Sequence, residues 1–169
     1  MSSPEKPPWA SMSVKARGEW VEVVFNAKVA ALGLSVSKPY GDNQQFDFLV
    51  CDHAGKPVKV QVRSAWSKSP DHGYTVQIRH RVQRIVLGFD VLVAYIPPHD
   101  AWYVVPASSI GPGLMTMSVW PDALGGSLSR WEEYRSAWRH LSGDPEDDNR
   151  LLGITIHAAA DDGKKSKLP

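Results

Sequence analysis

Two neighbouring runs in the first half of the chain show its clearest pattern of hydrophobic and polar positions. The first run, FDFLV, is apolar except for Asp47, and the second, VKVQVRS, alternates strictly. Residues 53–57 between them have the composition of a turn, so the pattern predicts a β-hairpin. Because successive side chains of a strand point to opposite faces, the valines form a core face, and Lys59, Gln61 and Arg63 form a polar face.

A long helix is predicted before the hairpin, over residues 13–32. Ser13 is a good N-cap, and Gly33 is a residue at which helices commonly end. The expected apolar stripe, which would pack on a sheet, holds Trp20, Val24, Ala27 and Ala31. Glu22 lies with Glu19 on another side of this helix. On the residues alone, a functional carboxylate and a plain solvated side chain are equally good interpretations of Glu22.

Further strands and a second helix complete the pattern. LSVSK precedes the hairpin, and after it come the alternating run YTVQIRHRV, the uniformly apolar FDVLVAYI, its partner AWYVVPA and a weaker strand, MTMSVW. SLSRWEEYRSAWRHL predicts an amphipathic helix, because apolar residues recur at spacings of three and four, at Leu128, Trp131, Tyr134, Trp138 and Leu141. This order predicts an α/β or α+β fold with a central mixed β-sheet flanked by helices.

The length of 169 residues suits one domain. We expect a flexible N-terminus over residues 1–12, the domain over 13–142 and a flexible C-terminal tail over 143–169. No apolar run approaches the roughly 20 residues that cross a bilayer, and the first residues lack a signal peptide's apolar core, so we expect a cytoplasmic protein without a membrane partner. The single cysteine, Cys51, excludes an internal disulfide and a cysteine-based zinc site.

The net charge of +1 conceals a basic segment. Residues 56–84 hold seven basic side chains and one acidic side chain. Such a local field suits contact with phosphates. The expected DNA-binding residues are Lys38, Lys59, Lys68, Arg79, Arg81 and Arg84. A solvated strand end is an equally good interpretation of the arginine cluster, and the histidines, which lack ligand spacing, are not assigned to a metal.

Asp47 is the first candidate for chemistry, because an acid inside a strand is disfavoured and needs a partner such as a cation. If the helix packs across the hairpin, Glu22, Asp47 and Gln61 meet at one edge of the sheet. Two carboxylates and an amide carbonyl are suitable ligands for a hard divalent ion such as Mg²⁺. With Arg63 beside them to hold a phosphate, the residues predict phosphodiester hydrolysis.

The order of these motifs resembles the PD-(D/E)XK nuclease superfamily, and more closely its branch of group I intron-encoded homing endonucleases and related bacterial proteins. The resemblance runs from about residue 17 to 141 and is carried by GEWVE (18–22), KPYGDNQQFDFLV (38–50), VQVRSAW (60–66), FDVLVAYIP (89–97), WYVVPA (102–107) and YRSAW (134–138). It implies a restriction-endonuclease-like core and a DNA endonuclease that depends on Mg²⁺ or Mn²⁺.

The resemblance also implies roles for single residues. Glu22 is the helix acid, with Glu19 the less favoured choice, and Asp47 is the metal-binding acid. Gln61 stands where most of the superfamily has an acid and this branch has glutamine. Arg63 stands where the family usually has its catalytic lysine. This is a departure, because lysine can lose its proton whereas arginine stays charged.

Three functions therefore remain open. The first is a metal-dependent endonuclease, expected as a homodimer or higher homo-oligomer so that two sites address two strands. The second, favoured by Arg63, is a catalytically degenerate protein that binds DNA or a protein partner without cleavage. The third, a purely structural domain, fits poorly with the basic segment. The endonuclease requires that Glu22 and Asp47 come within reach of one magnesium ion.

Overall fold

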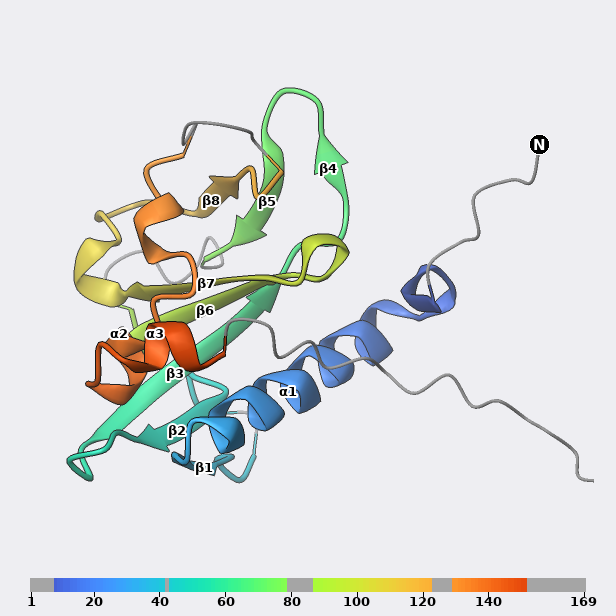
Figure 1. Cartoon of the computed structure of the whole chain (residues 1–169). Helices are drawn as coiled ribbons and strands as arrows, with labels where there is room; N and C mark the ends of the chain where they lie inside the picture. Colours follow the sequence, from blue (N-terminus) through green and yellow to red (C-terminus); the bar gives the residue numbers. More distant parts are fainter. Residues whose placement is uncertain (1–7, 42, 79–86, 123–128, 152–169) are drawn as a thin grey trace, which may run out of the picture.

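The centre of the protein is a five-stranded mixed sheet. The computed structural model describes residues 8–41, 43–78, 87–122 and 129–151 (Figure 1). In spatial order the strands are β1 (Ser35–Ser37), β2 (Phe48–Cys51), β3 (Pro57–Ser64), β6 (Val91–Ile96) and β7 (Ala101–Pro106). β3 and β6 run parallel, and the other neighbours run antiparallel. A mixed sheet with helices confirms the predicted fold class.

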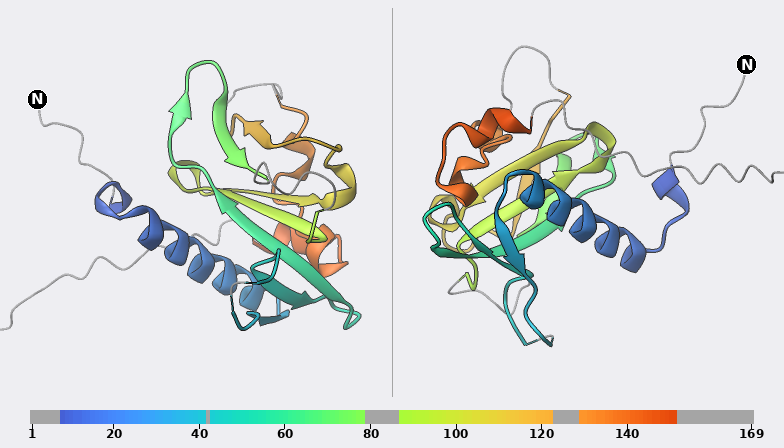
Figure 2. Two further views of the ribbon diagram at one scale, coloured as in Figure 1. Left: turned by 180° about the vertical axis from the view of Figure 1, so that it is seen from behind. Right: turned by 60° about the horizontal axis from the view of Figure 1, so that its bottom comes forward.

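Two layers cover the sheet. The helix α1 (Val14–Ala31) packs on one face, in a core that joins its apolar side chains to those of β2, β3 and β6. A second, three-stranded sheet packs on the other face (Figures 1 and 2). Its strands, in spatial order, are β4 (Lys68–Ser69), β5 (Gly73–Gln77) and β8 (Thr116–Val119). The run YTVQIRHRV therefore begins in this second sheet, and residues 79–86 lie outside the described part of the chain.

The helix α1 begins and ends at the predicted signals. The Ser13 hydroxyl accepts a hydrogen bond from the backbone N–H of Ala16 at 3.2 Å, and Gly33 adopts a positive φ of 74° after the last turn. The predicted apolar stripe is wrong in part, since Ala31 is exposed. The buried residues of the helix are Val21, Val24, Phe25, Lys28 and Val29. Burial of the larger side chains removes more apolar area from water than burial of alanines, and this sets the rotation of the helix.

The predicted hairpin is present as β2 and β3. The backbone N–H of Asp47 bonds to the carbonyl of Val60 at 2.8 Å, so the pairing continues one residue before β2. The three valines of β3 belong to the core beneath α1. The other face of β3 is not uniformly solvated as predicted, because Gln61 is only 6% exposed. It pairs with Leu92 of β6, which belongs to the core between the two sheets.

The prediction of a single helix over SLSRWEEYRSAWRHL is wrong. The described part of this segment forms a 3₁₀ helix, η4 (Glu132–Tyr134), and a short helix, α2 (Arg139–Ser142). Between them Ser136 has a φ of 51°, and its N–H bonds to the carbonyl of Trp102 at 2.8 Å. Trp131 is buried in the core between the sheets, whereas Trp138 is buried in the core beneath α1. One straight helix would not reach both cores.

Packed segments also lie outside residues 13–142. Before α1, a 3₁₀ helix η1 (Pro8–Ser11) brings the Trp9 ring to 6.0 Å from that of Trp66. After residue 142, the helix α3 (Asp147–Arg150) is followed by Leu151, which is buried in the core beneath α1. Within the described ranges, no helix is both long and apolar enough to cross a membrane.

Candidate active site

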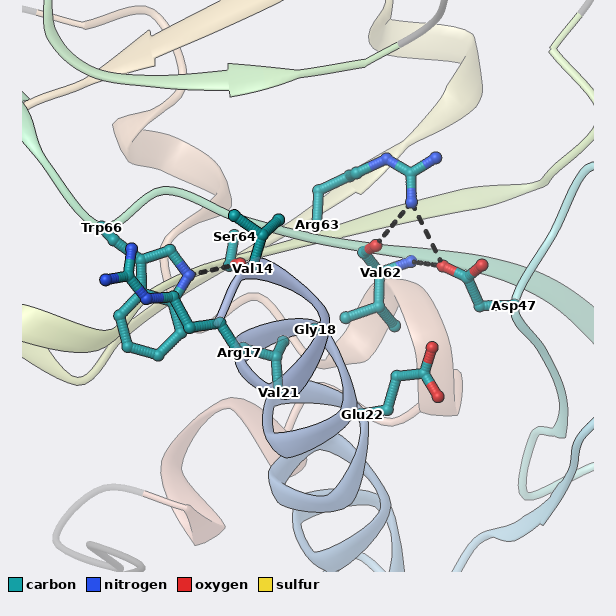
Figure 3. Close-up of a pocket in the computed structure, with 10 residues that line it drawn as sticks. All are labelled: Val14, Arg17, Gly18, Val21, Glu22, Asp47, Val62, Arg63, Ser64 and Trp66. Carbon is teal, nitrogen blue, oxygen red and sulfur yellow. Dashed lines mark hydrogen bonds and ion pairs between the residues drawn. The ribbon is translucent and has the colours of Figure 1, made fainter. Parts of the chain in front are cut away.

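A cleft of about 400 Å³ lies between α1 and the end of β3 (Figure 3). Its helix wall holds Val14, Arg17, Gly18, Val21 and Glu22, and its sheet wall holds Asp47, Val62, Arg63, Ser64 and Trp66. The helix residues are spaced by three and four, so they form one stripe that faces the cleft. Glu22 and Asp47, which are far apart in the sequence, thus lie in one cleft together with Arg63.

The Asp47 carboxylate is held from the β3 side. Its Oδ2 accepts a hydrogen bond from the backbone N–H of Val62 at 2.8 Å and another from the Nε2 of Gln61. Gln61 is buried beside Asp47 and does not line the cleft. Since the Asp47 N–H is itself bonded to β3, both the backbone and the side chain of this residue are fixed. The local hairpin register therefore sets the direction of the carboxylate.

The electrostatic environment of Asp47 is unfavourable to its charge. Burial raises the pKa of the Asp47 carboxyl above its usual range, and the nearby charge of Glu22 raises it further. The Val62 N–H, Arg63 and Gln61 act in the opposite direction without reversing the shift. The two carboxylates are therefore close enough to repel each other, and an added cation would relieve that repulsion.

Two basic side chains flank these acids. The Arg63 Nη1 lies 3.6 Å from the Asp47 Oδ2 and donates a hydrogen bond to the carbonyl of Val62 at 3.0 Å. The Lys38 Nζ lies 2.5 Å from the Glu22 Oε2, and this bond raises the pKa of the Lys38 amine. Lys38, predicted to contact DNA, is thus next to the cleft as the partner of Glu22.

The remaining predicted DNA contacts are on other elements. The exposed Lys59, on β3, places its Nζ 5.8 Å from the centre of the Phe46 ring. Lys68, on β4, forms an ion pair of 2.5 Å with Asp122. Arg79, Arg81 and Arg84 lie outside the described residues. Their contact with DNA stays a prediction.

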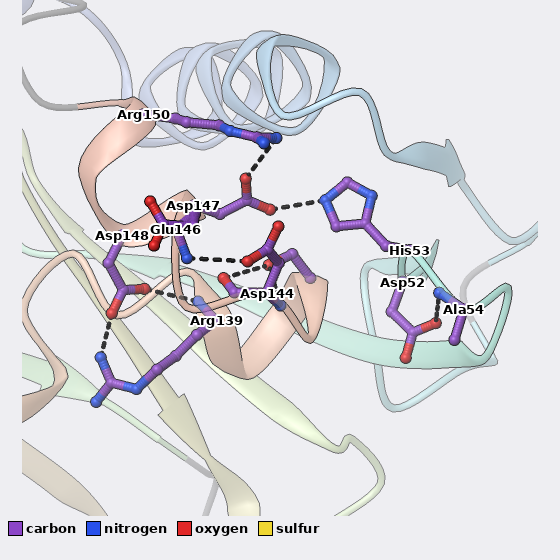
Figure 4. A network of polar contacts seen from close by, with 10 residues as sticks. Asp52, His53, Ala54, Arg139, Asp144, Glu146, Asp147, Asp148 and Arg150 are labelled. Carbon is purple, nitrogen blue, oxygen red and sulfur yellow. Dashed lines mark hydrogen bonds and ion pairs between the residues drawn. The ribbon is translucent and has the colours of Figure 1, made fainter.

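No pattern in the sequence predicts a second cluster, which is formed by His53, Asp144 and Asp147 (Figure 4). One ligand atom from each lies within 4.8 Å of the others, a geometry that is able to hold a metal ion. Asp147 is fully buried: its Oδ2 is 2.8 Å from the His53 Nε2, and its Oδ1 is 2.9 Å from the Nη1 of Arg150. Ninety-four residues separate His53 from Asp147, so no local spacing pairs them.

Comparison with known proteins defines the class of this chain. The sequence model of the family described as PD-(D/E)XK endonuclease matches residues 12–135, and the chain belongs to that family. Among solved structures it is similar to a bacterial homing endonuclease, I-Ssp6803I, with 26% sequence identity and a TM-score of 0.63. That similarity covers 82% of this chain and 98% of the other. A search of curated proteins found no match. The resemblance noted from the motifs, including its homing-endonuclease branch, is confirmed.

Proposed function

We propose that the protein is a metal-dependent DNA endonuclease whose active site is the cleft of Figure 3. One observation carries the proposal: Glu22 and Asp47 lie in the same cleft, and the charge of one raises the pKa of the other. Membership of an endonuclease family supports DNA as the substrate, and the similar homing endonuclease supports cleavage within the DNA chain.

The donor chemistry of the cleft fits Mg²⁺ or Mn²⁺. Hard divalent ions prefer oxygen ligands, and Glu22 and Asp47 supply two carboxylates whose charges are only partly neutralised by neighbouring side chains. Gln61 holds Asp47 through its amide nitrogen, and its carbonyl oxygen would be the third ligand of the proposed set. When bound, such an ion supplies an activated water and stabilises charge on the phosphoryl oxygens.

The chain's own residues then have separate tasks. The Val62 N–H and Gln61 fix the Asp47 carboxylate, and Arg63 binds a phosphate oxygen with its guanidinium. No lysine lines the cleft in the described part of the chain. The nearby Lys38 has a raised pKa, so at neutral pH it acts as a cation and not as a base. The proton of the attacking water therefore leaves to solvent or to a carboxylate.

A second function stays in view because of Arg63. If the reaction requires a side chain that gives up its proton at this position, the protein binds DNA, or a protein partner, without cutting it. A homodimer, which would present two clefts to the two strands, is part of the endonuclease proposal.

Incubation with supercoiled plasmid distinguishes these functions. We expect nicking in the presence of Mg²⁺ or Mn²⁺, no nicking in EDTA, and no nicking by Asp47→Asn, which keeps an oxygen for the Val62 N–H. A salt-sensitive shift of the plasmid without nicking supports the binding protein instead. A protein that neither binds nor nicks the plasmid would contradict both functions.

A further inference from the structure

One wall of the cleft has no role in the chemistry above. It is formed by Arg17, Gly18 and Trp66, and we call it the tryptophan wall (Figure 3). Arg17 and Gly18 lie on the same stripe of α1 as Glu22, toward the start of the helix. None of the three residues is among the basic side chains that the sequence assigned to DNA contact.

The guanidinium of Arg17 is held in place but is incompletely bonded. It lies over the Trp66 ring, with its central carbon 5.3 Å from the ring centre. That ring is fixed by a hydrogen bond from its Nε1 to the Ser64 hydroxyl at 2.9 Å and by packing against Trp20. The Nε of Arg17 is buried and has no hydrogen-bond partner among the residues that the structure describes. Arg17 lines the cleft, and the nitrogens of a guanidinium are strong donors to phosphate oxygens, so an outside phosphate is a suitable acceptor for this group.

Gly18 leaves room for such an acceptor. It lies inside α1, and its φ is not positive, so the backbone does not require glycine. A Cβ at this position would meet nothing within 4 Å, so packing within the described chain does not require it either. Glycine lowers helix stability relative to alanine. What it allows is the close approach of another molecule to the helix backbone.

The wall stands at a suitable distance from the two acids. Glu22 follows Arg17 by five positions, which correspond to about 7.5 Å along the helix axis. This is roughly twice the axial rise per phosphate of one DNA strand, which is about 3.4 Å. A strand that has one phosphate at Glu22 and Asp47 and follows the cleft toward the start of α1 would bring another phosphate near Arg17.

We infer that the tryptophan wall is a binding site for a backbone phosphate one or two nucleotides from the phosphate that is cut. The inference rests on the proposed function for the position of the cut. Trp66 positions the guanidinium, Arg17 binds the phosphate oxygens, and Gly18 leaves space for the strand. The site would hold the DNA in register without reading its sequence.

Binding of a short labelled DNA duplex in EDTA, over about 50 to 200 mM salt, tests the inference. Arg17→Gln should reduce the slope of log affinity against log salt by about 0.9, the effect of one lost phosphate contact. The matched control is Lys15→Gln, which removes a charge from the same helix at a residue outside the cleft that pairs with Glu19. It should leave the slope unchanged. Equal slopes for the two variants would overturn the inference.

Gly18→Leu distinguishes a loss of space for DNA from a loss of folding. Leucine is a strong helix former, so the melting temperature should stay at or above that of the wild type, while DNA affinity falls by about tenfold or more through the added bulk. Wild-type affinity in this variant would contradict the inference.

Plasmid nicking by the wild type with Mg²⁺, measured in parallel, reports on the proposed function separately. If the wild type does not nick but Arg17→Gln lowers the slope, the phosphate site stands and the endonuclease proposal fails. If the wild type nicks and Arg17→Gln matches Lys15→Gln, the phosphate site fails and the endonuclease proposal stands.

Discussion

Two carboxylate clusters of this protein differ in how their charges are matched. The cluster of His53, Asp144 and Asp147, with Arg150, is called the C-terminal network. In it, both oxygens of the fully buried Asp147 lie within 3 Å of a nitrogen, one from His53 and one from Arg150. In the cleft, the side chain of Asp47 is 26% exposed, and the nitrogen of Arg63 is 3.6 Å away. The partner of Glu22 is Lys38, whose side chain is 61% exposed.

This difference indicates that the C-terminal network stabilises the fold, whereas the cleft is able to accept a ligand. The C-terminal network ties the turn between β2 and β3 to α3 through His53 and Asp147 (Figure 4). The backbone N–H of His53 adds a bond to the carbonyl of Ser142 at 3.0 Å. Asp147 in this network has two nitrogen-bearing neighbours inside the protein, His53 and Arg150. The cleft instead retains repulsion between two acids beside a solvent-accessible volume, which a divalent cation would relieve. Both clusters place oxygens close together, but the cleft is where the charge of one acid, Glu22, raises the pKa of another, Asp47, beside an accessible volume.

The largest effect should come from Asp47→Asn. Loss of one carboxylate should slow plasmid nicking by at least about 100-fold, as does the loss of other charge-stabilising groups in active sites. Unfolding in urea should change little, since the asparagine oxygen can still accept from the Val62 N–H. Asp147→Asn is the matched control, and its folded form should nick at the wild-type rate. If the two variants exchanged these results, the assignment of the clusters would be reversed.

A substitution in the C-terminal network should change the stability of the protein. Asp147→Ala leaves His53 and Arg150 without their shared acceptor and should lower the free energy of unfolding by about 1–3 kcal/mol. Urea denaturation measures this loss of stability. Asp144→Ala is a milder control, because Asp144 is less buried than Asp147. A loss of nicking without a loss of stability would show that this network is catalytic.

Arg63→Lys tests the departure from the family pattern. If removal of a proton limits the reaction, lysine should raise the nicking rate, on the order of tenfold, because its pKa can fall whereas that of arginine cannot. The rate at saturating Mg²⁺ is the measurement. An unchanged rate would indicate that a fixed positive charge is sufficient at this position.

Lys38→Gln should expose Glu22 to the metal. Exposed ion pairs are worth about 0.2–1 kcal/mol, so the Mg²⁺ concentration for half-maximal nicking should fall by up to about fivefold. Lys15→Gln controls for net charge, because Lys15 pairs with Glu19 and does not line the cleft. A higher Mg²⁺ requirement in Lys38→Gln would mean that Lys38 assists the site and does not compete with the metal.

The smallest effect concerns pH. Because the folded-state pKa of Asp47 is raised above its ordinary value of 3.8, the folded protein holds this proton more tightly than the unfolded chain. The contribution of Asp47 to stability is therefore present below pH 3.8 and is lost as pH rises through the folded pKa. The stability of Asp47→Asn relative to the wild type should rise over that window in the absence of metal. A constant difference in urea denaturation across the window would contradict the shift.

Local signals predicted the frame of the molecule and the positions of both acids. The cap at Ser13, the stop at Gly33 and the turn between the hairpin strands act within a few residues, so they can be read from the sequence. The pairing of Glu22 with Asp47 could be anticipated because one helix packed on one hairpin leaves few arrangements.

Tertiary contacts explain the parts that could not be predicted. Trp131 and Trp138 have helical spacing, but they pack into two cores on opposite faces of the sheet, and the backbone bends at Ser136 between them. Gln61 has the pattern of a solvated position, but it is buried where β3 pairs with β6 and where its amide bonds to Asp47. The contact of His53 with Asp147 depends on how the end of the chain folds back.

The central claim is that the cleft, and not the C-terminal network, binds the divalent ion. Paramagnetic Mn²⁺ titrated into the isotopically labelled protein broadens the NMR signals of nuclei near its binding site. The account predicts that the backbone amide signals of Asp47 and Val62 broaden first and that Asp47→Asn abolishes this broadening. Early broadening at His53 and Asp147, with Val62 unaffected, would contradict it.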